Sequence, residues 1–140
     1  MDTTTSARPR AATADRATAV LAAIDVVVVV GFVTFGLVSH GTSPLSDPVR
    51  SLETVAPFLF GWLVASGLAG VYARDVYTSP KRTARLTAVA WIAAANVGLI
   101  LRTSPVFDQT AVFPFNLVIT GFGLLFLLCW RVAYALYASN

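Results

Sequence analysis

Residues 17–38 of this chain read ATAVLAAIDVVVVVGFVTFGLV, an apolar run interrupted by one charged residue, Asp25. At a rise of about 1.5 Å per residue, a helix of this length crosses a hydrocarbon core of about 30 Å. The composition of the whole chain also indicates a membrane protein, since 56% of its 140 residues are hydrophobic and only 12% are charged. That leaves too little polar surface to cover a soluble globule of this size. The sequence therefore predicts an integral membrane protein.

Three further apolar runs follow the first, at residues 55–73, 86–101 and 112–130, and the last continues as a short segment at residues 132–137. The run 86–101 is short, but Arg85 and Arg102 at its ends can extend their side chains to the membrane surface. We predict an all-α, four-helix transmembrane bundle over residues 16–140. Residues 1–15 are rich in Thr, Ala and Arg and predict a disordered cytoplasmic tail.

The distribution of Lys and Arg predicts the orientation, because cytoplasmic loops retain positive charge. Four spans place both termini on one side, and that side would carry most of the basic residues, namely Arg8, Arg10, Arg16, Arg74, Lys81, Arg82, Arg85 and Arg131. The opposite side would carry Arg50 and Arg102. We therefore expect a multi-pass protein of the cell membrane with both termini cytoplasmic. The net charge of +3 arises from these basic residues, whose positions are explained by membrane topology. We therefore expect no nucleic-acid partner.

Each predicted span carries a polar residue near mid-depth, which together form a candidate intramembrane polar layer: Asp25, Ser66, Asn96 and Thr120. An ionisable group at this depth costs several kcal/mol and marks a candidate functional site. Two interpretations are open. Asp25 could titrate in a proton- or ion-handling site, with Ser66 and Asn96 as hydrogen-bonding partners. Alternatively, Asp25 could tie helices together as a packing device.

A second candidate cluster lies on the predicted external side and comprises His40, Asp47, Arg102 and Asp108. His40 with the carboxylates could bind a metal or titrate as a pH sensor. A lone histidine at a helix end is more often a solvated cap, so we predict no metal and no cofactor. Arg102 could attract an anionic substrate, but anchoring a short span is its simpler role.

No catalytic constellation is recognisable, so we do not expect an enzyme. There is no Ser-His-Asp set at plausible depth, no phosphate-binding glycine loop and no HExxH or CxxC motif. Small residues do recur at helix-packing spacing, at Gly61 and Ala65 and at Ala90, Ala94 and Gly98. Such residues let helix backbones approach closely, within one chain or between chains.

Several short motifs occur in a distinctive order: Asp25, Ser39-His40, Pro57-Phe58 followed by Gly61-Trp62, and Arg102. Over residues 16–131 the chain resembles a family of small prokaryotic membrane proteins known only as a domain of unknown function. The resemblance implies that the family's characteristic positions are Asp25, His40, Pro57, Trp62 and Arg102. It also implies an arginine where this chain has Leu37, and it supplies no established activity.

Two functions from different classes fit these observations. The first is a small ion- or proton-linked permease that uses Asp25. The alternative is a non-catalytic membrane subunit or scaffold that binds a partner through small-residue helix faces. Either protein would contact the lipid bilayer, and either would work as a homo-oligomer or with a membrane-protein partner.

Overall fold

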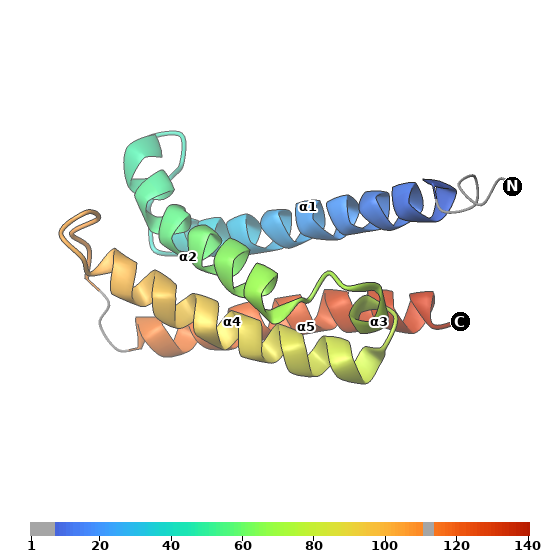
Figure 1. The fold of residues 1–140 in the computed structure, drawn as a ribbon. Helices are drawn as coiled ribbons and strands as arrows, with labels where there is room; N and C mark the ends of the chain where they lie inside the picture. Colours follow the sequence, from blue (N-terminus) through green and yellow to red (C-terminus); the bar gives the residue numbers. More distant parts are fainter. Residues whose placement is uncertain (1–7, 111–113) are drawn as a thin grey trace, which may run out of the picture.

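The computed structural model describes residues 8–110 and 114–140, with side chains from residue 15 onward (Figure 1). These residues form five helices: α1 (Arg8–Ser39), α2 (Pro48–Ala69), α3 (Arg74–Tyr77), α4 (Pro80–Arg102) and α5 (Phe115–Ala138). Four segments are long and apolar enough to cross a membrane, namely Asp15–Ser39, Pro48–Ala69, Pro80–Arg102 and Phe115–Ala138. The predicted all-α, four-helix membrane fold is therefore confirmed. The start of α1 and the end of α5 lie at the same end of the bundle, and the membrane side of that end stays a prediction.

The first helix begins earlier than its apolar run. α1 starts at Arg8, inside the predicted tail, while residues 1–7 lie outside the described part of the chain. The residues between the two starting points include several alanines, which have the highest helix propensity. The predicted helix start at residue 17 was based on where the apolar run begins. The preceding residues form helix without being apolar, so α1 begins earlier.

The second helix begins at Pro48 rather than residue 55, because its first turns are polar but well capped. The Asp47 carboxylate accepts a hydrogen bond of 3.2 Å from the backbone N–H of Arg50, and Pro48 occupies the first turn, where it needs no partner. The helix ends at Ala69, because Gly70 takes the left-handed conformation with φ 69°. Residues 71–73, expected within the span, therefore belong to a connection.

The fifth helix runs to Ala138 rather than ending near residue 130. Arg131 suggested a span end, yet its side chain is buried within the helix bundle. The first residues of the predicted fourth span, 111–113, lie outside the described part of the chain. A charged residue in mid-helix requires a partner inside the protein, and that partner is Asp25.

Small residues hold α2 and α4 close together. A Cβ atom added to Gly61 would lie 2.5 Å from the carbonyl oxygen of Ala94, and one added to Gly98 would meet the ring of Phe58. Both helices thus approach at the glycine and alanine positions noted in the sequence. At least part of this small-residue pattern serves packing within the chain.

A buried tryptophan joins α4 to α5. Trp91 is fully buried, and its indole N–H donates a 2.9 Å hydrogen bond to the backbone oxygen of Thr120. Gly123 leaves room for this indole, since an added Cβ would overlap the ring. α1 contacts α2 and α5 through a face that repeats every fourth residue, at Leu21, Asp25, Val29 and Val33.

Candidate functional site: a buried carboxylate with a full set of donors

Asp25 of α1 and Arg131 of α5 form a buried ion pair. Their side chains are 0% and 1% exposed. Nη2 of Arg131 lies 2.7 Å from Oδ2 of Asp25, and Nε lies 3.0 Å from Oδ1. Two parallel N–H donors facing two carboxylate oxygens make a bidentate pair, the geometry in which the planar guanidinium binds a carboxylate most strongly.

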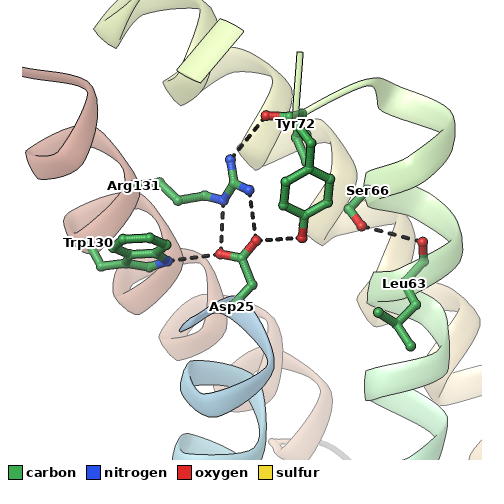
Figure 2. A network of polar contacts seen from close by, with 7 residues as sticks. Asp25, Leu63, Ser66, Tyr72, Trp130 and Arg131 are labelled. Atoms are coloured by element: carbon green, nitrogen blue, oxygen red, sulfur yellow. Dashed lines mark hydrogen bonds and ion pairs between the residues drawn. The ribbon is translucent and has the colours of Figure 1, made fainter. Parts of the chain in front are cut away.

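Two further side chains complete the carboxylate's hydrogen bonding (Figure 2). The Tyr72 hydroxyl donates to Oδ2 at 2.6 Å, and the Trp130 indole N–H donates to Oδ1 at 2.9 Å. Each oxygen of Asp25 therefore accepts two hydrogen bonds. Because an ionised carboxylate offers about four acceptor positions, this one is saturated by the chain's own donors.

The guanidinium of Arg131 also holds the connection that follows α2. Its Nη1 lies 3.4 Å from the backbone oxygen of Val71. The guanidinium carbon lies 5.0 Å from the centre of the Tyr72 ring and 5.7 Å from the centre of the Trp62 ring, within cation–π range. The site thus joins α1, α5 and the connection that follows α2, three segments that are distant in the sequence.

Burial fixes Tyr72, which lies beyond the end of α2, as a hydrogen-bond donor. Burial raises the pKa of Tyr72 from 10.0 to about 12, and the negative charge of Asp25 contributes in the same direction. A shift in this direction favours the protonated phenol, which is the form that donates the hydrogen bond to Asp25.

The structure does not assemble the predicted polar layer around Asp25. Ser66 is buried beside Tyr72 (Figure 2), but its hydroxyl is paired with the backbone oxygen of Leu63 at 3.4 Å. Asn96 is exposed on α4 and donates to the backbone oxygen of Ile92. Thr120 is half-buried, and its carbonyl accepts the hydrogen bond from Trp91. Within the described residues, the hydrogen-bond donors to Asp25 are Tyr72, Trp130 and Arg131.

Sequence reasoning missed these three donors. Arg131 was assigned to topology, because a basic residue after an apolar run is typical of a cytoplasmic span end. The available signal was the apolar segment 132–137, which was expected to continue beyond Arg131 but was not counted as part of the membrane span. A continued span places a positive charge inside the membrane, and a second intramembrane charge is the expected partner for Asp25.

The external cluster is assembled only in part. Asp47, Arg102 and Asp108 line one pocket of about 430 Å³ at the end of the bundle opposite the termini. His40 is exposed in the connection between α1 and α2 and does not line that pocket. Over the residues that the structure describes, no group of three or more His, Cys, Asp or Glu side chains is placed to hold a metal ion.

Comparison with known proteins adds one finding. Residues 22–134 match the family described as "Protein of unknown function (DUF3054)", and this range includes Asp25, Tyr72, Trp130 and Arg131. No curated protein and no solved structure matches the chain. The resemblance to a family known only as a domain of unknown function is thus confirmed. Since the match spans well over half of its length, the chain belongs to this family of proteins of unknown function.

Proposed function

We propose that the chain is a non-catalytic membrane subunit or scaffold, in which the Asp25–Arg131 pair holds α1 against the other helices. The observation that carries this proposal is the saturation of the Asp25 carboxylate by Tyr72, Trp130 and Arg131. A site that binds an ion or a proton in transit needs an acceptor position open to it. Here the four acceptor positions are used by donors of the same chain, which is the arrangement of a helix-to-helix fastening.

The partner surface in this proposal is an apolar groove between α2 and α4. The groove has a volume of about 310 Å³, and its lining includes Ala65, Leu68, Val89, Ala93 and Val97. The groove runs between α2 and α4, and both of these helices are long and apolar enough to cross a membrane. Small side chains between larger ones allow a second backbone to approach closely, so an apolar transmembrane helix of another membrane protein fits this groove.

Filling the groove tests the partner role. Ala93→Leu places a larger side chain in it, and Ala133→Leu makes the same change at an exposed position of α5. After affinity purification in mild detergent, we expect one membrane protein to accompany the wild-type chain and Ala133→Leu, but to be lost from Ala93→Leu. Both variants should unfold like the wild type, because neither residue belongs to the buried core.

Two outcomes would contradict this assignment. If Ala93→Leu retains the same associated protein, the groove is not its binding surface. If the chain purifies as a homo-oligomer that only Ala93→Leu dissociates, the occupant is a second copy rather than another protein.

A small ion- or proton-linked permease is the second candidate, favoured by the presence of an ion pair within the membrane. Protonation of Asp25 would remove one partner's charge and release Arg131, a change that a proton gradient can drive. In proteoliposomes, the permease hypothesis expects a proton-dependent flux that Asp25→Asn abolishes at unchanged abundance. Flux through the wild type no greater than that of empty liposomes would exclude this candidate. A loss of assembly in Asp25→Asn without any flux to lose would support the scaffold.

A further inference from the structure

The polar pocket opposite the termini contains an arginine whose side chain is held in place. Arg102 lies at the end of α4, and its Nε donates a 2.8 Å hydrogen bond to the backbone oxygen of Thr110. Its guanidinium carbon lies 4.5 Å from the centre of the Phe115 ring. These contacts fix the plane of the guanidinium while using only one of its three nitrogens.

One buried donor of this pocket, Nη1 of Arg102, has no hydrogen-bond acceptor within the described residues. The side-chain amide of Gln109, which also lines the pocket, lies 3.2 Å from the Thr54 hydroxyl, and that hydroxyl donates its one proton to the backbone oxygen of Arg50 at 2.9 Å. The amide nitrogen of Gln109 can therefore donate to the Thr54 oxygen, which leaves Arg102 with the unsatisfied donor. A buried donor without an acceptor is costly, and an oxyanion would satisfy it.

The pocket also holds charges of both signs that are not paired with each other. Its lining includes Arg50 and Arg102 together with Asp47, Glu53 and Asp108. The ion pairs among the described residues are Asp25–Arg131 and Asp75–Arg82, so none of these five residues belongs to one. Asp47 caps α2, which leaves Glu53 and Asp108 to act on a ligand. Carboxylates beside the arginines would repel a simple anion but attract one that also carries an ammonium group.

We propose that this pocket binds a small zwitterion. Its carboxylate or phosphate group accepts hydrogen bonds from Arg102, and its ammonium group lies against Glu53 and Asp108. The volume of about 430 Å³ is within the range of small-molecule sites. This site is far from the Asp25–Arg131 pair along the bundle and is independent of the proposed scaffold role. The zwitterion can be a soluble molecule or the headgroup of an ethanolamine lipid, since both offer the same chemistry.

Calorimetry on the full chain in detergent tests the soluble source, with phosphoethanolamine as the probe and inorganic phosphate and ethanolamine as its halves. Arg102→Gln should weaken phosphoethanolamine binding about tenfold or more, because it removes charge-assisted hydrogen bonds. Glu53→Gln should also weaken it, while Arg85→Gln, an exposed residue at the other end of α4, should leave it unchanged. Each half alone should bind more weakly than the intact zwitterion.

The lipid source is tested in nanodiscs by native mass spectrometry. Phosphatidylethanolamine should stay bound to the wild type, and Arg102→Gln should lose the retained lipid. Phosphatidylcholine should not stay bound, because its quaternary ammonium has no N–H to donate to Glu53 and Asp108. Glu53→Gln serves in both assays if Arg102→Gln does not fold, because Glu53 lines the pocket and lies outside the buried core. The proposal is overturned if neither phosphoethanolamine nor the ethanolamine lipid binds. It is also overturned if inorganic phosphate binds as tightly as phosphoethanolamine and Glu53→Gln has no effect.

Discussion

Replacing Arg131 with Met should destabilise the protein by about 3–5 kcal/mol, the usual cost of removing one partner from a buried ion pair. The variant leaves the fully buried carboxylate of Asp25 without its bidentate partner, although Tyr72 and Trp130 can still donate to it. The free energy of unfolding, measured by denaturant titration in mixed micelles, should show the loss. Met keeps much of the apolar volume of the arginine, so the effect reports mainly on charge.

Arg85→Met is the matched control. Arg85 is exposed near the start of α4, and its replacement should change the free energy of unfolding by no more than about 0.5 kcal/mol. Equal effects of the two substitutions would show that Arg131 acts through general charge or solubility rather than through Asp25.

Gly123→Ala should be the second most damaging change, at about 1–3 kcal/mol, the range typical of overpacked cores. An added Cβ overlaps the indole of Trp91, which is fully buried and cannot move aside freely. Displacement of the ring would also weaken its hydrogen bond to the backbone oxygen of Thr120. The same unfolding titration measures this loss.

Gly121→Ala provides the comparison on the same helix. A Cβ added to Gly121 meets nothing within 4 Å, and alanine favours a helix over glycine. This variant should unfold at the same denaturant concentration as the wild type or a slightly higher one. If Gly123→Ala is equally harmless, then α4 and α5 do not pack as closely as Trp91 implies.

The sequence was sufficient to predict the helical membrane fold, because continuous apolar runs of this length pair all their backbone groups in lipid when they form helices. The helix ends were less predictable. α2 begins at Pro48 because Asp47 caps the helix there. A hydropathy pattern does not predict this start, because a capping residue is polar. Similarly, α5 continues past Arg131 because that charge is neutralised inside the bundle.

The candidate site was predictable only in its first member. Asp25 was evident as the one charge in the apolar runs, whereas its partners depend on how each helix is rotated and how deeply it sits. Asn96 shows the difference. Its predicted membrane depth is similar to that of Asp25. However, it lies on the exposed face of α4, where its side-chain amide donates to the backbone oxygen of Ile92. Tyr72 reaches Asp25 from a connection that was expected to be helix.

A double-mutant cycle of Asp25→Asn and Arg131→Met tests most directly whether this ion pair fastens α1 to the bundle. Free energies of unfolding are needed for the wild type, both single variants and the double variant. We predict that the double variant is more stable than the sum of the single losses implies, with a coupling energy of about 2 kcal/mol or more, within the range for residues in direct contact. Additive losses, with a coupling energy near zero, would contradict the account.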